Sequence, residues 1–159
     1  MATPRALSAL DVLNIAVEIE HRGAVFYETM SRDAERPAVG ELFRYLTQME
    51  QVHIDVFQKM LNALGEPQPS NYSDDYDEYI NALADNAIFT DDLALSQAVT
   101  GADSDNRAME LGMRVEKDSI LFYEAIKDRL PEKQQPTVSR VIAEEKSHLR
   151  RLAAVKKTL

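Results

Sequence analysis

One arrangement of metal-binding residue types occurs twice in this chain and constrains its fold more than any other feature. In each half, a lone glutamate is followed by a Glu-x-x-His motif, at a distance of 30 positions in the first half and 29 in the second. The residues concerned are Glu20, Glu50 and His53 in the first half and Glu116, Glu145 and His148 in the second. Positions i and i+3 of a helix share a face, so the two side chains of each motif can bind one cation. Four carboxylates and two imidazoles on four helices predict a two-metal site.

Each half of the chain has the pattern of a helical hairpin. Apolar residues recur at helical spacing over 8–64 and 104–157, with Ser8 as an expected N-cap and Gly65 as the end of the first hairpin. Pro37 and Pro131 are predicted to open the second helix of each hairpin, and the midpoints of the paired glutamates, 35 and 130.5, fall at these turns. We therefore predict an all-α four-helix bundle made of two helical hairpins, with one domain over 1–159 and a long crossover over 65–103.

The crossover is acidic and is expected to contain two short helices. Ser73 is the predicted cap of a helix over 74–86, and Thr90 that of a helix over 91–99 that Gly101 ends. Its acidic residues are Asp74, Asp75, Asp77, Glu78, Asp91 and Asp92. They form a candidate recognition surface, although acidic residues are also common in solvated first turns of helices.

Composition excludes several classes of function. A net charge of −9, from 18 basic and 27 acidic residues, argues against a nucleic-acid surface or an anionic membrane as partner. The absence of cysteine excludes disulfides, zinc ribbons and cysteine-ligated iron-sulfur centres. Asp11 and Asn14 interrupt the apolar N-terminal run well short of a signal sequence, so we expect a cytoplasmic protein.

The charge of the six-residue set indicates which metals fit it. Four carboxylates in apolar helix stripes would each cost several kcal/mol without partners, and two divalent cations neutralise them. Oxygen and nitrogen ligands without thiolate suit iron or manganese, and zinc can occupy such a site in vitro. We predict that Glu50 and Glu145 bridge two ions, while Glu20 and Glu116 bind one ion each. The histidines complete one ion each.

Other residues near the glutamates have either structural or functional interpretations. Glu18 and His21 also stand at i and i+3, but both lie off the apolar stripe and are expected to face solvent. Tyr27 and Tyr123 lie seven positions beyond the lone glutamates and are candidate hydrogen-bond donors to the carboxylates of the opposite hairpin, or alternatively core aromatics. Glycines at 23 and 112 allow close helix packing or open a route for a small oxidant.

Together with a Phe-Tyr pair after each lone glutamate, these motifs make the chain resemble rubrerythrin-type members of the ferritin-like superfamily of di-iron carboxylate proteins. The resemblance covers essentially all of the chain, and it implies a bundle, usually dimeric or larger, whose two iron ions react with hydrogen peroxide or dioxygen. Two features depart from the family. Typical members carry a cysteine-rich rubredoxin domain, and they carry an extra glutamate one turn from the third-helix ligand. Here the positions one turn from Glu116 are Gly112, Met113, Ser119 and Ile120.

Three functional hypotheses follow. The first is a di-iron peroxidase that reduces hydrogen peroxide, a role in oxidative stress, with electrons from a separate donor protein and with the four glutamates as metal-site carboxylates. The second is a ferroxidase or iron-handling protein that uses dioxygen. The third is a structural metal-binding bundle. In each case we expect a homodimer.

Overall fold

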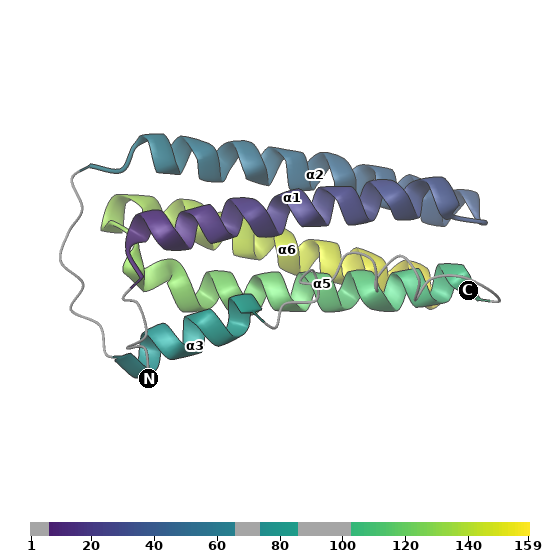
Figure 1. Cartoon of the computed structure of the whole chain (residues 1–159). Coiled ribbons are helices and arrows are strands. Elements are labelled where there is room, and N and C mark those ends of the chain that lie inside the picture. Colours follow the sequence, from purple (N-terminus) through teal and green to yellow (C-terminus); the bar gives the residue numbers. More distant parts are fainter. Residues whose placement is uncertain (1–6, 66–73, 86–102) are drawn as a thin grey trace.

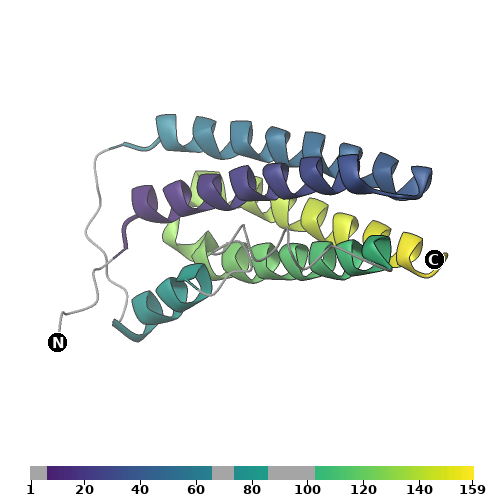
Figure 2. The same cartoon turned by 45° about the vertical axis from the view of Figure 1, so that its right-hand side comes forward.

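Helices make up most of the described chain. The structure, a computed structural model, describes residues 7–65, 74–85 and 103–159. Four long helices run side by side in both views (Figure 1, Figure 2), and within these ranges no strand occurs. They are α1 (Ala9–Asp33), α2 (Pro37–Asn62), α5 (Ser104–Ile126) and α6 (Gln135–Lys156). The predicted all-α four-helix bundle is confirmed.

The first hairpin begins and turns where the sequence predicts. Ser8 caps α1, because its Oγ accepts a hydrogen bond from the Asp11 amide at 3.1 Å while the Asp11 carboxylate accepts one from the Ser8 amide at 2.9 Å. Residues 34–36 form the turn, and Pro37 takes the first position of α2. An amide hydrogen has no partner within the helix at that position, so proline is well tolerated there.

The end of α2 differs slightly from the prediction. The helix ends at Asn62, and Gly65 lies beyond it. Ala63, in a right-handed conformation, donates its amide to the Lys59 carbonyl at 3.1 Å and closes the last turn. The helix therefore ends without a left-handed glycine.

The start of α6 also differs from the prediction, because Pro131 does not open it. Two 3₁₀ turns, η2 (Lys127–Arg129) and η3 (Glu132–Gln134), precede α6, which starts at Gln135. An α-helix that started at Pro131 would need an amide hydrogen on Pro136, which has none. Starting at Gln135 places Pro136 in the first turn, where no such hydrogen is needed.

The helix predicted in the crossover is present as α3 (Asp74–Asp85), which lies beside α5 outside the four-helix bundle (Figure 1, Figure 2). Asp77 is buried and forms an ion pair with Arg129. The same guanidinium donates to the Leu7 carbonyl and lies 4.6 Å from the centre of the Tyr76 ring. Asp77 thus fixes α3 to the end of the bundle, and its assignment to a recognition surface is wrong.

The other acidic residues of the crossover divide into two groups. Asp74, Asp75 and Glu78 are exposed, and the two aspartates are solvated residues of the first turn of α3. The predicted caps, the second short helix and two acidic residues lie outside the described residues, namely Ser73, Thr90, Gly101, 91–99, Asp91 and Asp92.

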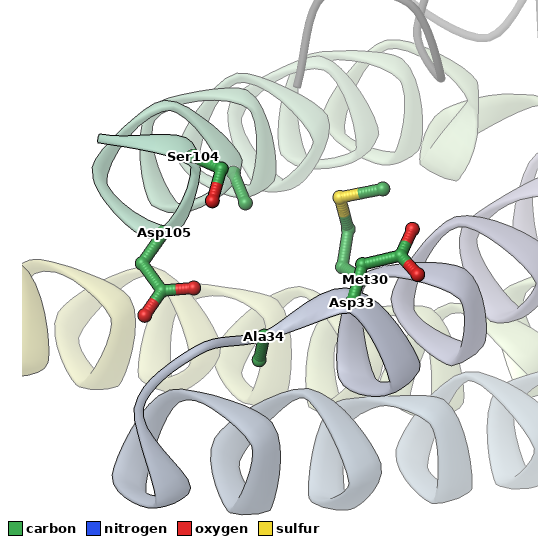
Figure 3. A pocket seen from close by; sticks show the side chains of 6 residues that line it. Met30, Asp33, Ala34, Ser104 and Asp105 are labelled. Atoms are coloured by element: carbon green, nitrogen blue, oxygen red, sulfur yellow. The ribbon is translucent and has the colours of Figure 1, made fainter. Parts of the chain in front are cut away.

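A buried carboxylate also joins the two hairpins at the opposite end of the bundle. Asp105 of α5 accepts hydrogen bonds from the backbone amides of Glu35 and Arg36, at 3.0 and 2.9 Å, in the turn before α2. Because Arg36 has no side-chain cap of its own, Asp105 serves as the cap from the other hairpin. Figure 3 shows Asp105 beside a small pocket between the end of α1 and the start of α5. The cavity volume of about 10 Å³ suffices for about one water molecule.

Two apolar layers enclose the middle of the bundle. One, at the end nearer α3, contains Phe57 and Tyr123, and the other, at the opposite end, contains Tyr27 and Phe43. The polar residues predicted to bind metal lie on the four long helices between these layers. Among the described helices, none has a stretch long and apolar enough to cross a membrane.

Candidate metal centre

The four long helices bring the six predicted metal-binding residues together. Their relative exposure is at most 2%. They are Glu20 on α1, Glu50 and His53 on α2, Glu116 on α5, and Glu145 and His148 on α6. Because a buried carboxylate needs a partner, this concentration of polar groups within an apolar interior requires compensation.

The side chains form two overlapping clusters. In each cluster, each residue offers one potential ligand atom, and these atoms lie within 4.8 Å of one another. The first contains Glu20, Glu50, His53 and Glu145, and the second contains Glu50, Glu116, Glu145 and His148. Glu50 and Glu145 belong to both clusters, which is the arrangement expected for carboxylates that bridge two ions.

Glu145 occupies the centre of this arrangement. Its Oε1 lies 2.9 Å from Nδ1 of His53, and its Oε2 lies 3.1 Å from Nδ1 of His148. The two imidazole rings are stacked with their centroids 5.7 Å apart. Each oxygen of one carboxylate therefore faces a different histidine, as a bridging ligand would.

Several ligand atoms lack hydrogen bonds. The buried atoms without a hydrogen-bond partner include Glu20 Oε2, Glu50 Oε1, His53 Nδ1, Glu116 Oε2 and Glu145 Oε1. His53 Nδ1 and Glu145 Oε1 are 2.9 Å apart, yet the direction of their approach is not that of a hydrogen bond. Buried polar atoms rarely remain unsatisfied, and convergent oxygen and nitrogen lone pairs suit a cation. The residues therefore fit a pair of metal ions.

In the absence of metal, the pKa values of the four carboxylates are shifted. Burial, reinforced by neighbouring carboxylates, raises the pKa of Glu20, Glu50 and Glu116. Burial acts on Glu145 in the same direction, but contacts with Glu116 and the two histidines outweigh it and lower its pKa. Burial alone would lower the pKa of His53, but Glu145 and Glu20 outweigh it and raise this pKa to about 11. The metal-free cluster thus retains protons that divalent cations would displace.

The hydrogen bonds expected from the two tyrosines are present, and each crosses from one hairpin to the other. The Tyr27 hydroxyl lies 2.5 Å from Glu116 Oε1, and the Tyr123 hydroxyl donates to Glu20 Oε1. Burial and these carboxylates raise the pKa of both tyrosines, which therefore remain protonated donors. In both glutamates, the second oxygen is the one without a partner, so each tyrosine holds one oxygen and leaves the other facing the centre.

Gly23 makes room for one of the shared carboxylates. A Cβ atom at this position would lie 2.3 Å from Glu50 Oε2. The close packing expected at this glycine is therefore present, but the group that packs against it is the side chain of a candidate ligand. At Gly112, an added Cβ would lie 3.3 Å from the side chains of Leu152 and Tyr27, which is closer than an ordinary van der Waals contact, so this glycine allows close packing of the helices.

Glu144 also contacts the candidate centre, although the sequence pattern does not predict this. Its Oε2 lies 2.7 Å from Nε2 of His53, on the side of the ring that faces away from the cluster. Glu144 directly precedes Glu145, and its side chain is 37% exposed, so it has the pattern of an ordinary surface glutamate. No signal in the helical periodicity distinguishes it.

The Glu-x-x-His pair that lies outside the repeat does not belong to either cluster. Glu18 and His21 are both exposed, as predicted, and Glu18 pairs with Arg22 at 2.9 Å. Among the described residues, neither cluster contains a carboxylate beyond the four predicted ones. The extra glutamate expected near Glu116 from the resemblance therefore has no counterpart in the clusters.

Comparison with known proteins agrees with the geometry of the centre. No match was found among curated proteins or among solved structures. The family model described as Rubrerythrin matches residues 11–156, a range that contains both Glu-x-x-His motifs and both lone glutamates. This family comprises non-haem di-iron proteins, and the buried carboxylate and histidine clusters are compatible with such a site. The chain belongs to the rubrerythrin family.

Proposed function

We propose that the protein is a di-iron oxidoreductase that reduces hydrogen peroxide with electrons from a separate donor protein. The observation that supports this most is the pair of overlapping buried clusters that share Glu50 and Glu145. One ion would be held by Glu20, His53 and the shared carboxylates, and the other by Glu116, His148 and the same two carboxylates. Two bound ferrous ions supply the two electrons that, with two protons, reduce one hydrogen peroxide molecule to two water molecules.

The protein contributes orientation and seclusion to this chemistry. Tyr27 and Tyr123 each hold one oxygen of a terminal carboxylate and keep their own protons, because burial raises their pKa. The apolar layers on both sides keep bulk water from the centre and favour a small oxidant over larger molecules. The chain contains no cysteine, so electrons must come from a redox centre outside these residues.

Ferroxidase activity with dioxygen is the second candidate. The observation that favours it is the absence of a fifth carboxylate from the clusters of the described residues. The resemblance links that carboxylate to movement of one iron between ligands as its oxidation state changes. Without it, a peroxidase cycle of that kind lacks one ligand, whereas iron binding and oxidation need only the four glutamates and two histidines.

One anaerobic experiment separates these candidates. The protein is loaded with Fe(II), excess iron is removed, iron is counted per chain, and the rates of oxidation by hydrogen peroxide and by dioxygen are compared. We expect two irons per chain and faster oxidation by peroxide. Faster oxidation by dioxygen, followed by release of Fe(III), would instead assign a ferroxidase. No bound iron would contradict both and leave a structural bundle.

A further inference from the structure

The two nitrogens of His53 face different carboxylates. Nδ1 points toward the cluster, 2.9 Å from Glu145 Oε1 and 3.5 Å from Glu20 Oε2. Nε2 lies 2.7 Å from Glu144 Oε2 on the opposite side of the ring. Glu144 and Glu145 are consecutive residues of α6, about 100° apart around the helix, so one reaches the centre while the other reaches the outer side of the ring.

This geometry selects one tautomer of the neutral ring. An ionised carboxylate only accepts hydrogen bonds, so its contact with Glu144 places a hydrogen on Nε2 of His53. A neutral imidazole with a hydrogen on Nε2 has its lone pair on Nδ1, the nitrogen that faces the cluster. Carboxylates that accept a hydrogen bond from a metal-binding histidine fix its orientation and raise its basicity as a ligand.

His148 lacks the equivalent support. Its Nδ1 lies 3.1 Å from Glu145 Oε2, just as Nδ1 of His53 lies 2.9 Å from the other oxygen of the same carboxylate, Oε1. Its ring also forms a T-shaped contact with the Tyr45 ring, with the centroids 6.0 Å apart. Within the part of the chain that the structure describes, no carboxylate contacts the outer nitrogen of this ring. The two clusters have the same types of ligand but different support.

We propose that Glu144 is a positioning residue that directs Nδ1 of His53 toward the metal centre and strengthens binding at the metal position that includes His53, but not at the position that includes His148. This inference rests on the proposed two-metal site. It adds that Glu144 supports only one of the two metal positions. The ligand is a divalent cation, and Glu144 acts on it only through the imidazole ring.

The test uses metal affinity and histidine chemistry as its readouts. Metal-free full-length protein is titrated anaerobically with Co(II), whose visible absorption reports its coordination, in the wild type and in the Glu144→Gln and Glu144→Ala variants. Glu124→Gln is the matched control, because Glu124 is a half-exposed glutamate that also has one partner, Lys146 at 3.2 Å, and its substitution changes the net charge equally. ¹⁵N spectra of the Zn(II)-loaded protein identify which histidine nitrogens bind the metal.

The expected result is a loss confined to one of two binding steps. Glu144→Ala should weaken one step by about 10- to 100-fold, Glu144→Gln should weaken the same step less because its amide oxygen still accepts a hydrogen bond, and Glu124→Gln should change neither. In the wild-type spectrum, His53 should bind through Nδ1 with a hydrogen on Nε2. In Glu144→Ala at limiting metal, the signals of His53 should be the ones that lose their metal-bound form.

Three results would overturn the inference. One is unchanged affinity in both Glu144 variants, and another is binding of His53 through Nε2. An equal loss at both positions would indicate a general effect of charge or fold rather than positioning of one ring. A wild-type protein that binds no Co(II) or Zn(II) would refute the two-metal site itself, and this result is distinguishable from the other three.

Discussion

The hydroxyl of Tyr27, on the first hairpin, lies 2.5 Å from Oε1 of Glu116, on the second. This contact joins the two halves of the chain at the candidate metal centre, and Tyr123 and Glu20 form the reciprocal contact. Each tyrosine thereby fixes the position of a carboxylate on the other hairpin. Loss of either hydroxyl should therefore lower both the affinity for metal and the stability of the fold.

Replacing Tyr27 with phenylalanine should destabilise the metal-loaded protein more than the metal-free protein. When metal is bound, Glu116 is ionised, and a hydrogen bond to a charged group contributes about 1.5–3 kcal/mol, against about 0.5–1.5 kcal/mol for a neutral pair. Chemical denaturation with and without Zn(II) measures the difference. Tyr79→Phe, at a half-exposed tyrosine of α3, is the control. The prediction would be contradicted if Tyr27→Phe, like this control, changed the stability of the metal-loaded and metal-free proteins equally.

Replacing a shared carboxylate should cost more metal than replacing an unshared one. Glu50→Ala or Glu145→Ala removes a ligand from both clusters, so bound iron should fall well below two per chain. Glu20→Ala affects only one cluster and should retain about half of the metal of the wild type. Iron is counted by elemental analysis after removal of excess. His21→Ala, at an exposed residue, should leave the count unchanged, and normal iron content in Glu50→Ala would rule out a bridging role.

Gly23→Ala should weaken metal binding without a comparable loss of fold. The added Cβ would lie 2.3 Å from Glu50 Oε2 and displace this carboxylate, whereas alanine favours the helix itself by about 0.8–1 kcal/mol. Gly40→Ala is the matched control in α2, because its nearest contact would be an ordinary 3.4 Å. Metal titration and thermal denaturation of both variants make the comparison. Wild-type affinity in Gly23→Ala would show that Glu50 does not need this space.

The metal-free protein should become less stable as pH rises above 6.5. His53 has a pKa of about 11 in the folded chain against 6.5 for an ordinary histidine, so the folded state retains a proton that the unfolded chain releases across this interval. Its stabilising contribution is complete below pH 6.5 and decreases, by about 1.4 kcal/mol per pH unit for each such proton, as pH approaches 11. The raised pKa values of three glutamates act in the same direction from pH 4.5 upward. Glu145, with a lowered pKa, loses its contribution only below pH 4.5.

Denaturation midpoints between pH 6.5 and 9, with and without Zn(II), test this dependence. Because the metal takes the place of the protons, the stabilisation that it provides should grow with pH. His53→Gln should flatten the dependence of the metal-free protein. A metal-free midpoint that is constant or rises across this range would contradict the assignment of the retained protons.

The repeat in the sequence was sufficient to predict which six side chains come together, because helical geometry sets their positions. Glu50 and His53 share a face at any i and i+3 spacing in a helix, and the equal distance of Glu20 and Glu50 from the turn places them at one height. The same reasoning placed Tyr27 within reach of the other hairpin. These relationships depend on local regularity and on one antiparallel pairing, both of which the sequence pattern contains.

Residues whose role depends on the contact between hairpins could not be predicted in this way. Glu144, Asp77 and Asp105 are acidic residues of helices, and their spacing does not indicate whether they meet solvent or a buried donor. Asp105 is buried because the α1–α2 turn presents unsatisfied amides to it, and Asp77 because Arg129 reaches it from η2. Such partners are known only once the helices are placed relative to one another. The prediction that Pro131 opens α6 was wrong for a different reason, because Pro136 controls where this helix can start.

Each candidate metal position takes three residues from one hairpin and one from the other. Glu145 completes the cluster that is otherwise made by the first hairpin, and Glu50 completes that of the second. A cation bound at either position is therefore also a cross-link between halves that are far apart in the sequence. Metal binding and the docking of the two hairpins are therefore coupled, so in a chain cut between residues 65 and 103 a bound metal should add to the hydrogen bonds and apolar contacts that hold the hairpins together.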